Sequence, residues 1–407
     1  MPDERPEPNA AGAPRPPLPR AKRILFAAVT ALISISLLLV AGEIGIRMYR
    51  AKTKLPSPRS FIENPHGTGS YRLRPHLDAA TRVAGKTIAI RTNAHGMPWR
   101  EVAREKPGGV RRVAIVGDSF AQGLWAESAE KGLAGVFASI VEPGGFEVLN
   151  FGVSGYGLAD VALQIREEVL GFEPAFIVLV FYAGNDFIDT YLGLERYGVK
   201  DGALVHDDAV VRAKVPPEFN PAAVPLHERH GPWKRWTRSL RPHVKLYGAL
   251  RGISRRKSEP LLQEFKVRQS FTGRTFWSQK PYPPIAKQAR DVTLETLAAI
   301  SETCRENDVT LLVAALPFKE QVSSYTQRGS DFDIGRPQSF LREFCEERGI
   351  PYHDLLPAMR HYVRSNQRSV FVTDEIHLND EGHAVAGEEM AIWFRETLDR
   401  LSAPGAM

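Results

Sequence analysis

Short apolar runs alternate with longer amphipathic stretches between residues 111 and 398. Five of these runs predict buried β-strands, because they are brief and rich in β-branched residues: 112–116, 147–151, 176–181, 310–315 and 350–353. The amphipathic stretches predict helices at 132–141, 158–170, 286–307, 337–348 and 380–398. Strands that alternate with helices are typical of a parallel sheet covered on both faces, so the pattern predicts an α/β domain.

The most apolar stretch lies near the N-terminus. Residues 1–23 form a tail rich in proline, alanine and charge, which predicts disorder. Residues 24–42 then form an apolar run about long enough to cross a bilayer, and Arg20, Lys22 and Arg23 precede it. The positive-inside rule leaves the tail in the cytoplasm and the rest of the chain outside. We expect a retained signal-anchor, since Val40-Ala41-Gly42 is a weak exit site; a cleaved signal peptide is the alternative.

The rest of the chain divides by pattern. Residues 43–110 form a lead-in, in which 71–75 and 86–93 suggest an extended pair. Residues 111–398 form the main domain, with an insertion at about 187–285 and a last extended segment at 369–373. Residues 399–407 form a short tail.

Polar residues follow the predicted strands. Ser119 comes directly after the first strand, Gly155 follows the second and Asn185 the third. Asp374 and His377 follow the segment 369–373. Since the carboxyl ends of parallel strands meet at one edge of a sheet, we expect these loops to lie together.

The residue types in these loops suit nucleophilic catalysis. A serine hydroxyl is a poor nucleophile at neutral pH and needs a base, which in turn needs an orienting acid. Ser119, His377 and Asp374 are the types for such a triad. The backbone N–H groups of Ser119 and Gly155, with the amide of Asn185, would stabilise the negative charge on oxygen in acyl transfer.

Here the chain resembles the SGNH or GDSL hydrolase family. The four named positions match as Ser119, Gly155, Asn185 and His377. The short motifs around these positions match too: Gly117-Asp118-Ser119, Gly184-Asn185-Asp186, and Asp374 three residues before His377. The resemblance covers roughly residues 71–398. It implies a three-layer flavodoxin-like fold with sheet order 2-1-3-4-5, and a serine esterase or acyltransferase that needs no cofactor. Asn93-Ala94-His95-Gly96 before the first strand is similar to the membrane-anchored bacterial members.

Several residues have a second interpretation. Gly-Asp-Ser alone is common in turns, and Gly152 is an alternative to Gly155 as the N–H donor. Asn185 could instead cap the segment that follows it, and Asp374 could be a helix-entry residue. Asp186 is more typical of a structural residue, and His383 of a packing residue in the last helix.

Composition excludes other classes. The net charge of +6 is modest for 407 residues, and no zinc spacing or RNA-binding signature occurs, so we expect no nucleic-acid partner. Cys304 and Cys345 have no metal-type neighbours, so we expect no metal site, and we interpret them as two separate thiols rather than a disulfide.

The insertion carries a basic, aromatic segment at residues 230–257. It could lie on an anionic membrane surface, hold an anionic polysaccharide or form a lid over the crevice. It could equally be a solvated helical subdomain with an ordinary charged face.

These observations predict an enzyme of the bacterial inner membrane, with a cytoplasmic N-terminus and a periplasmic catalytic domain. Its expected substrates are O-acyl esters, above all O-acetyl esters on cell-surface carbohydrate. An O-acetyltransferase of polysaccharide assembly would use the same triad, with polysaccharide-assembly proteins as partners. A non-catalytic envelope protein that has kept the fold is the third hypothesis.

Overall fold

The structure is a computed structural model that describes residues 19–53, 61–63, 71–83, 86–193, 198–200, 203–205, 278, 280–282, 284–323, 333–373 and 376–402. Helix α1 (Arg20–Thr53) belongs to one compact unit, and the other described residues belong to a second. The predicted segment at 230–257 lies outside the described residues, as does most of the insertion. Two short strands of the insertion, β8 (Gly198–Lys200) and β9 (Ala203–Val205), form an antiparallel pair.

A five-stranded parallel sheet forms the centre of the second unit. Its strands are β5 (Arg111–Gly117), β6 (Phe146–Asn150), β7 (Pro174–Tyr182), β10 (Thr310–Leu316) and β11 (Tyr352–Asp354). They lie in the order β6-β5-β7-β10-β11, which is 2-1-3-4-5 when the strands are numbered by their position in the chain. The α/β fold class predicted from the sequence is confirmed.

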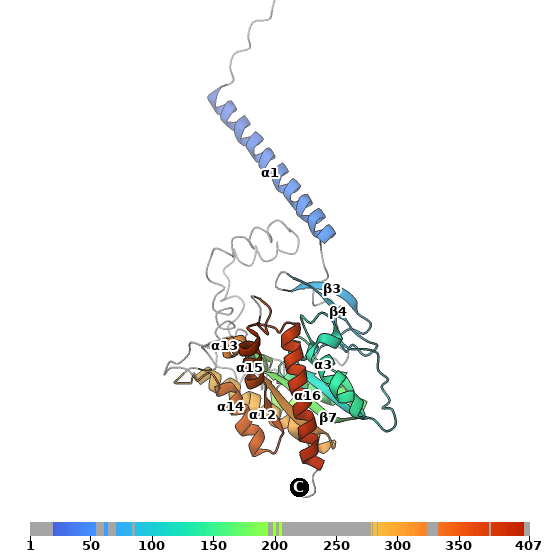
Figure 1. Cartoon of the computed structure of the whole chain (residues 1–407). Coiled ribbons are helices and arrows are strands. Elements are labelled where there is room, and N and C mark those ends of the chain that lie inside the picture. Colours follow the sequence, from blue (N-terminus) through green and yellow to red (C-terminus); the bar gives the residue numbers. More distant parts are fainter. Residues whose placement is uncertain are drawn as a thin grey trace, which may run out of the picture. The chain divides into compact units, whose positions relative to one another are not determined.

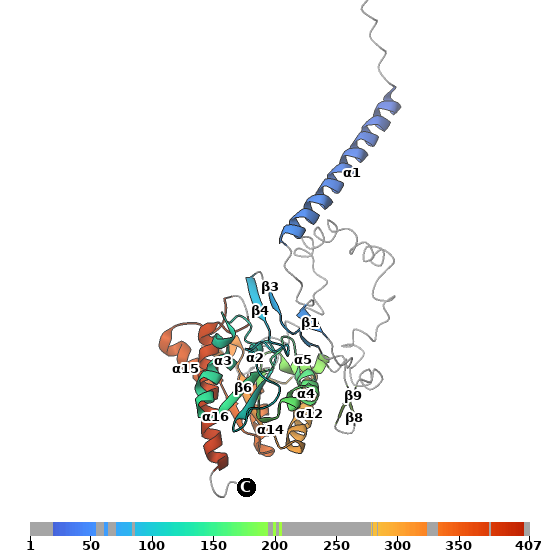
Figure 2. The ribbon, with the colours of Figure 1, turned by 90° about the vertical axis from the view of Figure 1, so that its right-hand side faces the viewer.

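Helices cover both faces of the sheet. On one face α3 (Leu133–Val141) packs against α16 (Asp380–Ser402), and on the other α12 (Pro284–Glu306) packs on α4 (Leu158–Glu167) and α5 (Asp186–Gly193) (Figures 1 and 2). The helix α14 (Arg336–Glu347) leads into β11, and α15 (Leu356–Asn366) follows it. Because both faces are covered, the central strands are almost wholly apolar.

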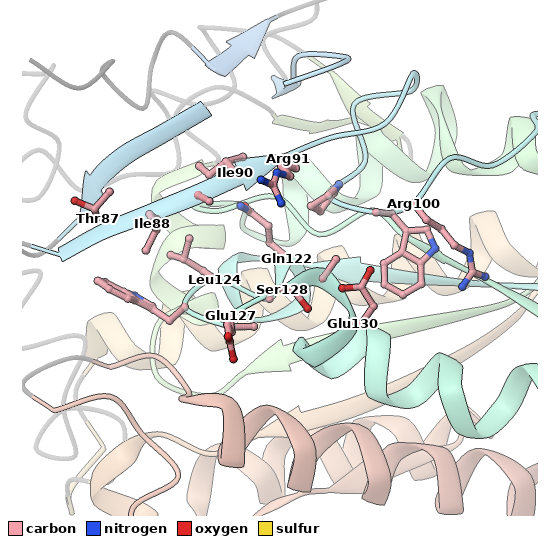
Figure 3. A pocket seen from close by; sticks show the side chains of 17 residues that line it. Thr87, Ile88, Ile90, Arg91, Arg100, Gln122, Leu124, Glu127, Ser128 and Glu130 are labelled. Carbon is pink, nitrogen blue, oxygen red and sulfur yellow. The ribbon is translucent and has the colours of Figure 1, made fainter. Parts of the chain in front are cut away.

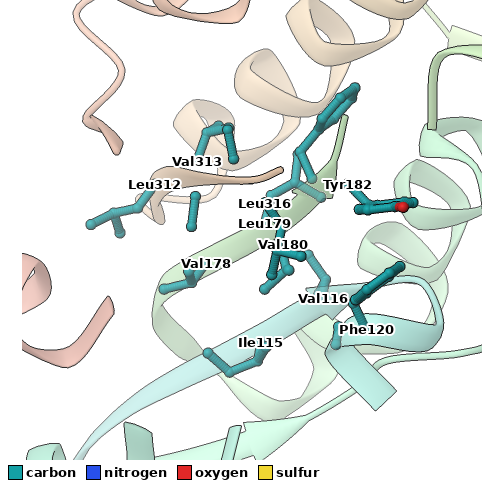
Figure 4. Packing of buried hydrophobic residues seen from close by; sticks show 14 of the residues in the cluster. Ile115, Val116, Phe120, Val178, Leu179, Val180, Tyr182, Leu312, Val313 and Leu316 are labelled. Carbon is teal, nitrogen blue, oxygen red and sulfur yellow. The ribbon is translucent and has the colours of Figure 1, made fainter. Parts of the chain in front are cut away.

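The core centres on β5, β7 and β10. Ile115, Val178 and Leu312 are completely buried, and Figure 4 shows their side chains on three adjacent strands. This continuous burial explains why these strands read as unbroken apolar runs. It also fixes the carboxyl ends of the strands, where the candidate site lies.

One polar residue is buried at the other end of this core. Arg112 of β5 has no exposed surface, and its Nε lies 2.7 Å from Glu147 Oε2. Its guanidinium also donates to four backbone carbonyls, those of Ala103, Arg104, Glu105 and Phe172. The side chain therefore ties the lead-in to the sheet.

The lead-in differs from the prediction. Residues 71–75 and 86–93 do not pair with each other; instead β4 (Lys86–Arg91) pairs with β3 (Asp78–Val83), and β2 (Arg72–Leu73) pairs with β1 (Ile62–Glu63). Only two residues separate β3 from β4, so the hairpin is the shorter connection. β3 has few apolar residues, and this is why its sequence gave no strand signal.

Other boundaries also need correction. The segment expected to be extended at 369–373 is not part of the five-stranded sheet, and an isolated antiparallel bridge links its Phe371 to Leu378. The predicted helix at 158–170 stops at Glu167, before a 3₁₀ turn at Val169–Phe172. The short helices α2 (Ser119–Gln122), α5 and α13 (Lys319–Ser323), and the longer α15, were not predicted.

The two cysteines are separate buried thiols, as expected: Cys304 is in α12 and Cys345 in α14. Burial raises the pKa of each thiol to about 12.

Helix α1 is long and apolar enough to cross a membrane over residues 20–45, and a signal sequence would have the same character. Its large apolar side chains are exposed, so it is not a core helix of the domain.

Candidate active site

Ser119 stands at a sharp turn between β5 and α2. Gly117 has φ +146°, and a Cβ there would lie 2.6 Å from the carbonyl oxygen of Val180, so the turn excludes a side chain. Asp118 caps α2, since its Oδ1 accepts a hydrogen bond from the Phe120 N–H at 2.9 Å. Ser119 is only 7% exposed. The turn thus fixes the serine at the carboxyl edge of the sheet.

The structure brings His377 to Ser119. The His377 Nε2 lies 2.9 Å from the Ser119 Oγ, across 258 residues of sequence. The imidazole packs against Phe120 with ring centroids 5.1 Å apart, and Phe120 stacks on Tyr182 at 4.0 Å. This is the serine–histidine contact that the sequence predicts.

Backbone contacts hold the loop that carries His377. The Val372 N–H donates to the His377 carbonyl at 2.9 Å, and the Lys319 ammonium donates to the Val372 carbonyl at 3.1 Å. Asp374 lies outside the described residues, so its role as the orienting acid stays a prediction.

The loop after β6 carries Gly155 at the same edge of the sheet as the nucleophile. Gly155 has φ +83°, a conformation that favours glycine. Its neighbour Ser154 is bound to α2, because Gln122 Oε1 accepts hydrogen bonds from the Ser154 N–H at 2.8 Å and its hydroxyl at 2.6 Å. On the other side the Tyr71 hydroxyl donates to the Ser154 carbonyl at 2.9 Å. This loop is therefore held from two sides.

The hydrogen bonds favour Gly155 over Gly152 as a donor. The Gly152 N–H already donates to Asn150 Oδ1 at 2.9 Å, and a Cβ at Gly152 would lie 2.1 Å from the Gln122 nitrogen. Within the described part of the chain, the N–H groups of Ser119 and Gly155 have no hydrogen-bond acceptor. Both are thus available to an oxyanion.

Asn185 follows β7 at the same edge. Its Nδ2 donates to Asp189 Oδ2 at 2.7 Å, one turn further along α5. Asp189 was missed in the sequence, although a carboxylate four residues after an asparagine at a helix start is a detectable signal. The Asn185 amide also interacts with the Asp118 carboxyl, where this hydrogen bond opposes the rise in the pKa of Asp118 that burial causes.

Two buried carboxyl groups lie under these loops. Burial raises the pKa of both Asp118 and Asp186 well above that of an exposed aspartate, and repulsion between the two acts in the same direction on Asp186. Asp186 Oδ2 accepts a hydrogen bond from the Tyr182 N–H at 2.8 Å. Its contacts are therefore structural, as expected.

His383 is buried between the last helix and the nucleophile loop. Its Nε2–H donates to the Leu124 carbonyl at 3.2 Å, and its Nδ1 accepts from the Leu133 N–H at 3.3 Å. Burial lowers the pKa of His383 to about 4, so it is neutral at ordinary pH. His383, which we expected to be a packing residue, thus links α16 to the loop at Leu124 and to the start of α3. Among the described residues, no group of three or more His, Cys, Asp or Glu side chains is arranged to hold a metal ion.

A family model decides the assignment. The model of the GDSL-like Lipase/Acylhydrolase family matches residues 115–385, which include Ser119, Gly155, Asn185 and His377. The chain belongs to this family. Membership in this family supports an ester hydrolase. It confirms the resemblance to the SGNH or GDSL hydrolases that the motifs of the sequence indicate.

Solved structures similar to this acylhydrolase include several esterases. The acetyl xylan esterase AlAXEase matches with 14% identity and a TM-score of 0.37, over 69% of this chain and 97% of that one. A GDSL-like lipase from Bacteroides thetaiotaomicron matches with 13% identity and a TM-score of 0.33, over 72% and 89%. A putative lipolytic protein of the G-D-S-L family from Desulfitobacterium hafniense matches with 13% identity and a TM-score of 0.35, over 69% and 98%. These values add nothing to the family assignment. No curated protein matches the chain.

Proposed function

We propose that this acylhydrolase is a membrane-anchored serine esterase that removes small acyl groups, above all acetyl, from cell-surface carbohydrate. The observation that carries the proposal is the 2.9 Å contact between Ser119 Oγ and His377 Nε2. It occurs at the carboxyl edge of a parallel sheet, where such folds bind ligands.

The first half-reaction follows from this contact. His377 Nε2 takes the Ser119 hydroxyl proton while Oγ forms a bond to the ester carbonyl carbon. The tetrahedral intermediate then collapses, the bond from carbon to the sugar oxygen breaks, and His377 returns the proton to that oxygen. An acyl-enzyme and a free sugar hydroxyl result. Asp374 is proposed to orient the imidazole through Nδ1–H.

The negative oxygen of the intermediate needs donors that are already in place. The N–H groups of Ser119 and Gly155 and the side-chain amide of Asn185 are proposed to bind it, the amide exchanging its contact with Asp118 for one with the oxyanion. Asp189 would keep the Asn185 amide in one orientation, which reduces the reorganisation needed during reaction.

Small acyl groups suit the space around the nucleophile. Ser119 is nearly buried, and the ring of Phe120, the next residue, contacts those of His377 and Tyr182. A nearly buried nucleophile with an aromatic ring next to it in the chain is proposed to leave little room for a long acyl chain. This crowding supports acetyl over fatty acyl esters.

The location is proposed from α1. Arg20, Lys22 and Arg23 precede its apolar run, which supports a retained anchor with the catalytic domain outside the cytoplasm. The proposed domain division is the one predicted from sequence, with the hydrolase domain at 111–398.

Product analysis tests the proposal. The detergent-solubilised full chain is incubated with isolated envelope polysaccharide, and the released acids are identified by mass spectrometry, with Ser119→Ala as control. We expect acetate from the wild type alone. Acetyl groups that move to an added oligosaccharide without acetate release would establish the acetyltransferase, which shares the acyl-enzyme. No acyl release or transfer from any polysaccharide would contradict the substrate class.

A further inference from the structure

A cavity of about 450 Å³ lies beside the nucleophile's helix. One wall is formed by β4 and the segment around Trp99, and the other by residues 122–130 (Figure 3). Cavities of about 300–1,000 Å³ commonly hold small ligands. None of the residues assigned to catalysis lines it, so it is distinct from the site of the reaction.

The second wall is connected to the reaction centre. Gln122 is the last residue of α2, which begins at Ser119, and it also holds Ser154 beside Gly155. Leu124 donates its N–H to the Ser119 carbonyl at 3.0 Å. A molecule in the cavity would therefore touch the chain within a few residues of the nucleophile.

Two tryptophans line the cavity, and each has an unusual feature. Trp125 has φ +75°, which is a rare and strained conformation for a bulky residue. Trp99 is 8% exposed, and its buried Nε1–H has no hydrogen-bond partner among the described residues. Buried indole N–H groups normally find an acceptor, so an acceptor on a ligand would satisfy this one once a shift of the ring uncovers it.

The charges of the cavity are balanced. Its lining includes two cations, Arg91 and Arg100, and two anions, Glu127 and Glu130. Three of the four have a partner of opposite charge: Arg91 pairs with Asp78, Arg100 with Glu142 and Glu127 with Lys131. A polyanion would need unpaired cations, and an acyl chain would need a continuous apolar wall. Aromatic rings among polar groups suit an uncharged ligand with apolar faces and many hydroxyl groups.

We propose that this cavity binds the uncharged sugar rings of the substrate, next to the ring whose ester reaches Ser119. The inference rests on the proposed carbohydrate esterase function and adds a subsite built by the lead-in. Trp99 donates its N–H to a sugar oxygen, and the partly exposed indole of Trp125 packs on a ring face.

Binding to the inactive full chain tests the subsite without turnover. Ser119→Ala protein in detergent is titrated calorimetrically with partially acetylated xylo- and manno-oligosaccharides, and with oligogalacturonate as an anionic probe. We expect at least one neutral oligosaccharide to bind and the anionic probe not to bind.

Three variants in the Ser119→Ala background locate the site. Trp99→Phe keeps the ring but removes the N–H, and we expect about tenfold weaker binding. Trp125→Gly removes the ring at a backbone position that glycine tolerates, so the fold is kept. Trp393→Phe, buried in α16 away from the cavity, is the control and should bind as before.

The same changes in active protein separate the two proposals. Trp99→Phe and Trp125→Gly should raise KM for acetylated oligosaccharide about tenfold and leave hydrolysis of an aryl acetate within about twofold, because that ester does not reach the cavity. Loss of aryl acetate hydrolysis in Ser119→Ala protein supports the proposed esterase activity, and this result does not depend on whether the cavity binds sugar. Absence of binding by every neutral oligosaccharide, or equal binding by all three variants, would overturn the subsite.

Discussion

At the scale of single residues, Ser119 and His377 would act as one catalytic unit. Their side chains touch at 2.9 Å, so removing either leaves the other without its function. Ser119→Ala and His377→Ala should each reduce hydrolysis of an aryl acetate by several orders of magnitude, and the double variant should be scarcely worse than either. Steady-state rates of the three folded variants measure this. Additive losses would exclude His377 as the base.

Asn185 offers a second test at this scale. If its amide binds the oxyanion, Asn185→Ala should lower kcat by roughly a hundred- to a thousandfold and change KM little, because the bond strengthens only in the transition state. Asn366→Ala, at the exposed end of α15, is a matched control that should leave both constants unchanged. A rise in KM alone would place Asn185 in substrate binding instead.

The site residues were predictable to different degrees. Ser119, Gly155, Asn185 and His377 were found because each stands in a spaced motif after a strand. Tyr71 and His383 act through contacts across the fold, and no local pattern reveals those contacts. Asp189 contacts Asn185 within one helical turn, so its spacing could have revealed it. His383 lies 259 residues from the carbonyl that it binds, which only the folded chain reveals.

At the scale of elements, His383 links α16 to the nucleophile loop and makes that link depend on pH. Its pKa is about 4 when folded, against 6.5 ordinarily, so the unfolded chain binds a proton that the folded chain excludes. The free energy of unfolding should thus fall as pH drops from 6.5 to 4, by on the order of 3 kcal/mol from this residue. The raised pKa values of Asp118 and Asp186 act in the opposite direction.

Comparison with a variant isolates the histidine. His383→Gln keeps a donor and an acceptor but does not titrate, so its free energy of unfolding should depend less steeply on pH between 4 and 6.5. Denaturant unfolding at a series of pH values measures the difference. Parallel curves for the two proteins would show that His383 is not the titrating group.

Arg112 tests how the lead-in is attached to β5. Arg112→Met leaves Glu147 and four carbonyls without their donor, and we expect a loss of about 3–5 kcal/mol in the free energy of unfolding. Arg305→Met, which removes an exposed pair with Glu302, is the control and should unfold like the wild type. A small loss at Arg112 would mean that water replaces the guanidinium.

Prediction of the elements succeeded where burial was continuous. The strands β5, β7 and β10 carry buried apolar runs, and the long helices have a clear amphipathic period. The edge strand β11 is short and only partly buried. The short helices α2 and α5 contain too few turns to show one. Strand β3 forms by pairing with β4, and its own sequence does not indicate this pairing.

At the scale of the whole molecule, α1 decides where the chemistry occurs. If α1 is retained as an anchor, the full chain should sediment with membranes, and a reporter active only in the periplasm should work when fused after residue 407. Fractionation and reporter activity, with the apolar run deleted as control, measure this. A soluble chain that starts near Glu43 would establish cleavage.

The long sequence separation of Ser119 and His377 has a consequence for biosynthesis. The ribosome makes the nucleophile's strand and turn early, whereas the histidine comes after almost the whole sheet has been synthesised. A stalled or prematurely terminated chain therefore has a serine without a base, and it is inert toward esters. If the domain is exported as proposed, this order of synthesis would protect the cell's own esters from incomplete copies.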